Sequence, residues 1–271
     1  MQALLFFIVY FQRNKIEPDN RQGLKASKTN PGNYFEDFKF GQVLTHATPR
    51  TLTEGDVALY LSLYGPRFAV QSSNAFAGAI GYQQAPVDDL LAFHIVFGKT
   101  VPDISLNAIA NLGYADGRFI KPVFPGDTLS TTSEVIGLKE NSNGETGTVY
   151  VRSTGRNQSG EVVLEYTRWV MVRKRDKGAP APQAIVPDLP ATVTPENLGK
   201  AVPKIDPKAY DNALAGSPFR WQDYEIGERI DHVQPRGGRQ HGRIADRLIK
   251  PRSFLVQKPE SRIEQPHHQV S

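Results

Sequence analysis

Two adjacent carboxylates and one histidine are the side chains that could carry out proton transfer. Asp88 and Asp89 open a mostly apolar stretch, and His94 follows within it. A carboxylate and an imidazole can serve together as general acid and general base. Helical residues five or six positions apart do not share a face, so His94 would not meet the two acids. We therefore expect the acids mainly to cap a helix, and we expect His94 to be a buried structural side chain.

The segment that carries these groups, residues 86–98, is predicted to be a helix. Its apolar side chains point in every direction around a helical wheel, which predicts burial on all sides. Asp88 is a candidate N-cap, and Gly98 is expected to end the helix, with Pro102 beyond it. A short apolar run can also be a buried strand, but the length and the cap favour a helix.

Capping residues and turn signals place the remaining elements. Residues 34–45 are expected to form a first strand, and residues 51–64 and 72–79 are expected to form helices behind Ser or Thr caps. Runs rich in Val, Ile, Thr and Tyr, separated by Gly-containing turns, predict hairpin-connected antiparallel strands. These runs are residues 104–115, 118–121, 127–139, 146–157 and 161–174. The order predicts an α+β hotdog fold, a sheet curled around a central helix, with another α+β sandwich as the alternative.

Composition excludes several classes of protein. The 271-residue chain has 39% apolar and 22% charged residues, which is typical of a globular protein. It has no cysteine, hence no disulfide or thiolate metal site, which fits a reducing, cytoplasmic setting. Residues 233–271 hold eight Lys or Arg against three Asp or Glu, so this tail accounts for the net charge of +4. The body is nearly neutral and the tail lacks aromatic residues apart from Phe254, so no nucleic-acid partner is expected.

Both ends of the chain are expected to lie outside the folded domain. Residues 3–11 are nine consecutive apolar residues, fewer than the roughly 20 needed to span a membrane. They lack the basic region of a signal peptide, so residues 1–30 are predicted to be a disordered or artefactual leader. A packing segment and a targeting segment are the alternatives. The tail 233–271 is too poor in apolar residues to offset its conformational entropy and is predicted to be disordered.

A proline-rich linker and an internal repeat follow the predicted domain. Residues 177–218 form the linker. Residues 35–46, FEDFKFGQVLTH, and residues 221–232, WQDYEIGERIDH, then match at an offset of 186. Residues 219–232 are therefore expected to begin a second copy of the domain. The pattern is lost at residue 233, as a shift of reading frame near that codon would produce.

Several stretches resemble a known family. Residues 118–129, RFIKPVFPGDTL, resemble the strand–turn–strand signature of the MaoC-like (R)-specific enoyl-CoA hydratases and dehydratases, and residues 157–163 are similar to a later hairpin. The resemblance covers residues 31–176. Residues 49–60, 64–73, 88–115 and 130–155 resemble the mesaconyl-CoA hydratase branch, whose members have two repeats.

The resemblance implies a hotdog fold and a hydro-lyase. The expected reaction is the reversible hydration of mesaconyl-CoA to β-methylmalyl-CoA, with coenzyme A as part of the substrate and with neither cofactor nor metal. A non-catalytic hotdog protein that binds acyl-CoA or a partner is the alternative, and an acyl-CoA thioesterase is a further one. A single hotdog unit exposes a sheet edge and a helix flank, so a homodimer without a membrane partner is expected.

The resemblance also leaves the catalytic residues open. The family signature places an Asp and a His five positions apart after a Gly, and residues 65–71 are the corresponding stretch. Pro66 and Gln71 stand in those two places, and neither transfers protons at neutral pH. The second repeat is therefore expected to hold the catalytic pair, and Asp88, Asp89 and His94 remain candidates in the first. Gln71, Arg118 and Lys121 are expected to bind substrate; for the two cations, ordinary surface charge is the alternative.

Overall fold

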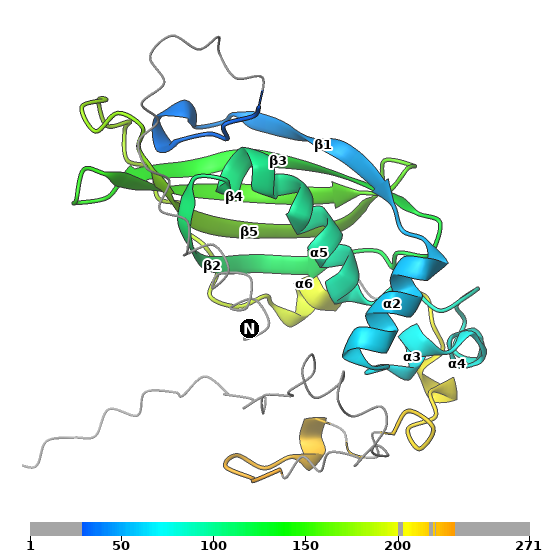
Figure 1. Ribbon diagram of the computed structural model, residues 1–271. Coiled ribbons are helices and arrows are strands. Elements are labelled where there is room, and N and C mark those ends of the chain that lie inside the picture. The colour runs from blue at the N-terminus through cyan, green and yellow to red at the C-terminus, as the bar shows by residue number, and fades with distance from the viewer. Residues whose placement is uncertain (1–28, 200–202, 217–218, 220, 231–271) are drawn as a thin grey trace, which may run out of the picture.

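The computed structural model describes residues 29–199, 203–216, 219 and 221–230, and it shows a five-stranded antiparallel sheet curled around one helix (Figure 1). The strands are β1 (Val43–Thr51), β2 (Ala108–Phe119), β3 (Thr128–Glu140), β4 (Thr146–Arg156) and β5 (Val162–Arg173), in the order β1-β3-β4-β5-β2. The helix is α5 (Asp89–Thr100). The predicted α+β hotdog arrangement is confirmed for this unit.

Alternation along the strands sorts core from surface. On β4, Val149, Val151 and Ser153 are fully buried, while Tyr150, Arg152 and Thr154 on the other face are half-buried or exposed. The prediction of separate strands at 104–115 and 118–121 is wrong, because β2 runs on to Phe119. A register shift between residues 115 and 118, where Asp116 has a φ of 50°, absorbs the turn-like sequence as a bulge.

Of the short helices before α5, α2 and α4 begin at a Thr and a Ser cap of the expected kind, whereas α3 has no side-chain cap. In α2 (Glu54–Tyr64), the Asp56 N–H donates to Thr53 Oγ1 at 3.2 Å, and the Asp56 carboxylate accepts from the Thr53 N–H, which completes a capping box. The predicted helix 72–79 is in fact two pieces, α3 (Ala69–Ser72) and α4 (Asn74–Ala79). The side chain of Ser73, between them, caps α4.

The central helix differs from its prediction at its end and in its burial. The helix passes Gly98 and continues beyond Thr100 into a π-helical turn, η3 (Val101–Ser105), which includes Pro102. Burial on all sides is wrong, because the sheet covers only one side of α5. Leu90 is 39% exposed and His94 is also exposed, so the prediction of a buried His94 is wrong too.

Two apolar clusters lie under α5 and η3, with polar side chains between them. One cluster surrounds Val96 and Leu129, and the other surrounds Ile104 and Val135. Along β3 and β5 the residues between the clusters are polar, including Ser133 and Arg168, and they are buried. Buried polar groups require hydrogen-bond partners, so each side chain of this polar layer must find a partner inside the core.

Part of the predicted linker packs against the domain. Ile185 and Leu138 exchange backbone hydrogen bonds of 2.8 and 2.9 Å, which adds a bridge beside the sheet. The Tyr210 ring meets Phe76 edge to face, with centroids 5.1 Å apart. The two copies of the sequence repeat each begin with a short 3-10 turn. These turns are η2 (Phe35–Asp37) and η5 (Trp221–Asp223).

The repeat is visible only as local conformation. Gly41 and Gly227, which match in the two copies, have φ values of 76° and 85°, a region that favours glycine. Residue 232 and the tail 233–271 lie outside the described residues, as does the leader up to residue 28. The second copy therefore stays a prediction.

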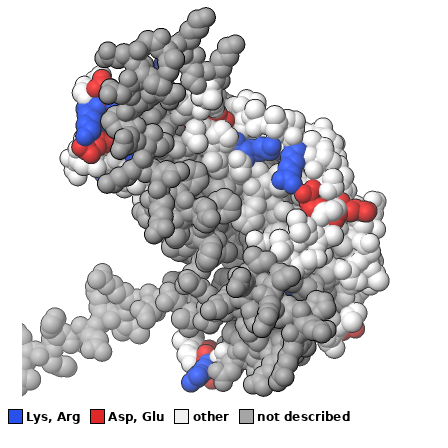
Figure 2. Space-filling view, viewed as in Figure 1, with Lys and Arg blue, Asp and Glu red and all other residues white. Residues whose placement is uncertain are grey.

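The described surface carries charges of both signs. Figure 2 shows Lys or Arg beside Asp or Glu on the viewed face. Within the described residues, no helix combines the length and apolar character needed to cross a membrane. No group of three or more potential metal ligands was found there either.

Candidate functional site

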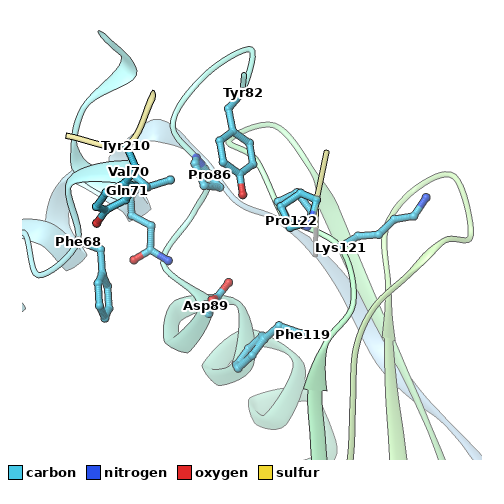
Figure 3. A pocket seen from close by; sticks show the side chains of 11 residues that line it. Phe68, Val70, Gln71, Tyr82, Pro86, Asp89, Phe119, Lys121, Pro122 and Tyr210 are labelled. Carbon is cyan, nitrogen blue, oxygen red and sulfur yellow. The ribbon is translucent and has the colours of Figure 1, made fainter. Parts of the chain in front are cut away.

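A pocket of about 290 Å³ lies at the N-terminal end of α5. Its walls come from α3, the loop before α5, the end of β2 and the segment around residues 203–210 (Figure 3). The polar groups include Gln71, Tyr82 and Asp89, and aromatic and proline side chains supply most of the remaining wall. A concave site with an apolar wall and a few convergent polar groups is typical of a small-molecule site.

The fold gives the two adjacent acids different roles. Asp88 is buried and caps the helix, with its Oδ1 accepting from the Leu90 N–H at 2.8 Å. Asp89 begins α5 and lines the pocket, with part of its surface open to solvent. Withdrawal from water, and next the charge of Asp88, raise the pKa of the Asp89 carboxyl to about 6. The prediction of a capping role thus holds for Asp88, whereas Asp89 is available in the pocket.

Three polar groups converge in the pocket. Figure 3 shows the Asp89 carboxylate, the Gln71 amide and the Tyr82 hydroxyl directed toward its middle. Gln71 Oε1 is buried and has no hydrogen-bond partner among the described residues. Burial, and then the charge of Asp89, raise the pKa of the Tyr82 phenol, which keeps this group a neutral donor. Together these groups can hold a water molecule and exchange a proton with a bound ligand.

The other candidate residues are placed differently. His94 projects from the exposed flank of α5 and is not part of the pocket wall. Its surroundings withdraw the imidazole from water enough to lower its pKa, an effect that the charge of Asp88 partly opposes. Pro66 is exposed in the loop after α2 and does not line the pocket.

The two candidate cations are engaged by carboxylates. Arg118 Nη2 donates to Glu165 Oε2 at 2.8 Å, and Asp116 lies on its other side. Lys121 lines the pocket, but its ammonium points away from the middle and pairs with Glu161 (Figure 3). The Lys121–Glu161 pair is exposed, and such pairs contribute little to stability and can exchange partners, whereas the Arg118–Glu165 pair is half-buried.

The sequence did not identify the aromatic part of the wall. Tyr82 lies in a turn before α5, and Tyr210 lies in the predicted linker, more than 100 residues from Asp89. No spacing in the sequence relates these residues, because only the return of the chain past α4 brings them together. The sequence pointed to Gln71 only because this residue replaces the His of the family signature.

His46, a residue singled out by the repeat, lies away from the pocket. Its Nδ1 is 2.7 Å from Asp103 Oδ2 and its Nε2 is 2.8 Å from Ser133 Oγ. Burial lowers the pKa of the imidazole, although Asp103 opposes this, so the ring is neutral at neutral pH. These two contacts tie β1 to η3 and β3, so His46 has a structural role.

Comparisons with known proteins give a consistent result. The family model for mesaconyl-CoA hydratase matches residues 21–197. The chain is 66% identical over 209 residues to a beta-methylmalyl-CoA dehydratase from Chloroflexus aurantiacus, covering 77% of this chain and 59% of that protein. It is 59% identical over 207 residues to a mesaconyl-CoA hydratase from Cereibacter sphaeroides, covering 76% and 60%. The chain thus spans about three fifths of the length of these curated relatives.

Solved structures agree. A MaoC domain protein dehydratase from Chloroflexus aurantiacus superposes with a TM-score of 0.72 at 64% identity, covering 77% of this chain and 59% of that one. A Mycobacterium tuberculosis protein with a double hotdog fold superposes with a TM-score of 0.51 at 28% identity, covering 69% and 56%.

Proposed function

This chain belongs to the mesaconyl-CoA hydratase family of MaoC-like proteins, and we propose that it serves the reversible hydration of mesaconyl-CoA to β-methylmalyl-CoA. The carrying observation is the family match across residues 21–197, which includes Gln71, Tyr82 and Asp89 of the pocket. In this reaction a water hydroxyl joins the β-carbon of the enoyl thioester and a proton joins the α-carbon. Coenzyme A is part of the substrate, and the reaction requires no change of oxidation state.

The pocket can supply what this chemistry needs. Hydration requires a base that activates water, a proton donor for the α-carbon and donors that polarise the thioester carbonyl. Asp89, with a pKa of about 6, is suited to accept and return the proton near neutral pH. The free Gln71 oxygen would orient the water, and the Tyr82 hydroxyl would donate to the carbonyl oxygen. The positive end of the α5 dipole supports the same developing charge.

Arg118 and Lys121 are proposed to meet the phosphates of coenzyme A. Lys121 is the better placed, because its carbon chain forms part of the pocket wall. Each would exchange its present carboxylate, Glu165 or Glu161, for a phosphate oxygen. CoA thioesters are highly charged and stay within the compartment where they are made, so a cytoplasmic location is part of this proposal.

A second copy is proposed to cover the open edge of the sheet. Among the described strands, β2 pairs with β5 alone, and Ile109, Leu112 and Phe119 on β2 are 42%, 43% and 37% exposed. An apolar strand edge of this kind pairs readily with another chain. Sedimentation of the purified chain should therefore show a dimer, and a stable monomer at micromolar concentration would contradict this part of the proposal.

A non-catalytic acyl-CoA-binding protein is the alternative function. The observation in its favour is that Pro66 and Gln71 occupy the positions of the Asp and His in the family signature. In that case the fold and the pocket would hold a thioester without turning it over.

One experiment separates these functions. The purified chain is incubated with mesaconyl-CoA while the absorbance of the conjugated thioester and the release of free thiol are followed, and binding is measured by calorimetry. Loss of conjugation without thiol release, abolished in Asp89→Asn, supports the hydratase and the role of Asp89. Binding without turnover supports the alternative, and thiol release would indicate a thioesterase instead. Turnover that persists in Asp89→Asn would exclude this residue as the base.

A further inference from the structure

One wall of the pocket comes from a segment that follows the folded domain in the chain. Pro203 and Tyr210 both line the pocket, and the residues between them include a 3-10 turn, η4 (Pro207–Ala209). Figure 3 shows Tyr210 on the same side of the pocket as Gln71. We call residues 203–210 the strap, because this segment contributes to the pocket wall at both of its ends. The pocket is therefore complete only when the strap lies in this position.

Few contacts hold the strap against the domain. The Asp206 N–H donates to the Ile80 carbonyl oxygen at 2.8 Å, and this is the one hydrogen bond that joins the strap to the rest of the described chain. The Tyr210 ring meets the Phe76 ring edge to face, with 5.1 Å between the centroids. A segment with so few contacts opens at a low cost in free energy, so its position can respond to a ligand.

The domain side of the pocket presents apolar surface that a ligand would cover. Phe68 and Phe119 line the pocket and are 56% and 37% exposed. Large apolar side chains that gather at a concave site and remain open to solvent are typical of a ligand-binding surface. Pro203 and Tyr210 of the strap add two further rings to the same wall. A ligand in this pocket would therefore contact the domain and the strap together.

We infer that the strap is part of the ligand-binding site and that Tyr210 is a positioning residue, whose ring holds the strap closed over the bound thioester. This inference rests on the proposed function for the choice of ligand. Tyr210 contacts Phe76 of the domain and also lines the pocket, so it links the strap to both the domain and the ligand. A ligand that binds only the closed arrangement shifts the strap toward that arrangement. The segment after the domain thus acts in binding and not only as a linker.

Limited digestion of the full chain with trypsin tests this inference. Lys204 and Lys208 are exposed residues of the strap, and Lys177 is an exposed residue that does not line the pocket. A protease cuts a transiently opened segment in proportion to the population of the open form. Saturating mesaconyl-CoA should therefore slow cleavage after Lys204 and Lys208 by at least about tenfold and leave cleavage after Lys177 unchanged. Mass spectrometry of the fragments gives the three rates.

Three variants test the role of the Tyr210 ring. Tyr210→Ala should remove the protection and weaken the binding of mesaconyl-CoA, measured by calorimetry, by about tenfold. Tyr210→Phe keeps the ring against Phe76 and should retain both the protection and the affinity. Leu214→Ala is the matched control, because it removes a 71% exposed apolar side chain just beyond the strap and outside the pocket wall, and it should change neither.

Two results would overturn the inference. One is equal cleavage after Lys204 and Lys208 with and without bound mesaconyl-CoA, and the other is full protection in Tyr210→Ala, or in Tyr210→Leu if the alanine variant does not fold. Hydration, followed in the same samples, separates this inference from the proposed function. Protection without hydration leaves the inference standing while the function fails, and hydration without protection does the reverse. If mesaconyl-CoA does not bind, both fail.

Discussion

The substitution Asp89→Asn tests the electrostatics of the pocket through stability as well as activity. The pKa of Asp89 is raised from 3.8 to about 6, and for a fully buried group such a shift corresponds to about 3 kcal/mol. Because part of Asp89 is open to solvent, screening reduces this value, and we expect about 1 kcal/mol. Asn has nearly the same shape and no charge, so it removes the penalty without leaving a cavity.

The sign of the effect depends on pH. Between about pH 4 and pH 6 the folded protein binds more protons at Asp89 than the unfolded chain does, so the contribution of this residue to stability falls as pH rises. Above pH 6 the penalty is complete and constant. Asp89→Asn should therefore be about 1 kcal/mol more stable than the unmodified chain at pH 7 to 8, and the difference should vanish near pH 4.

The assay is urea denaturation of both proteins at several pH values, with the difference in unfolding free energy plotted against pH. Asp88→Ala is the matched control, because the neighbouring residue caps α5 through its bond to the Leu90 N–H. Loss of that cap should destabilise the protein by about 1 kcal/mol at pH 7, the opposite sign. If Asp89→Asn is instead destabilising at pH 7, or its effect does not change with pH, the carboxyl does not have a raised pKa and the reasoning is wrong.

Three further changes test the fold and the edge. His46→Ala should cost about 2 kcal/mol, because it removes one hydrogen bond from the buried Ser133 hydroxyl, which keeps Ser153, and one from the Asp103 carboxylate; thermal unfolding measures this, and a loss below about 1 kcal/mol would contradict it. Gly147→Ala should cost at least about 3 kcal/mol or prevent folding, since a Cβ there would overlap the Phe35 ring; a normal melting temperature would argue against this packing. Leu112→Lys, a change at an exposed position of the edge strand, should shift the sedimenting species to a monomer without lowering the melting temperature of the unit, and an unchanged dimer would place the interface elsewhere.

Local chemistry made most elements predictable. The expected Thr, Ser and Asp caps are present at Thr53, Ser73 and Asp88, because a cap depends on residues within one turn. The alternation on β4 and the glycine turns fixed the hairpins, since strand period and turn conformation are also local. The family signature identified Gln71 as a position of interest, and the structure places it in the pocket.

The predictions that were wrong depend on how other parts of the chain pack against a helix or strand. His94 and Leu90 are on an apolar helix, yet the sheet reaches only the opposite side, so they are exposed. Gly98 and Pro102 resemble a helix stop, but packing under η3 carries the helix past them. The break predicted near residue 116 is absorbed by a bulge, because β5 continues to pair on both sides of it.

The sequence by itself determined the strand and helix order, the caps and the family, because each depends on short-range pattern or on matching residues. Tertiary structure alone decided which of two adjacent acids is free, since the pocket walls come from residues as distant as Gln71 and Tyr210. It alone placed buried phenols beside the buried Arg168, because strand register brings Tyr114 next to it. Burial and proximity across the sheet set the charge state of a group, and no spacing along the chain encodes them.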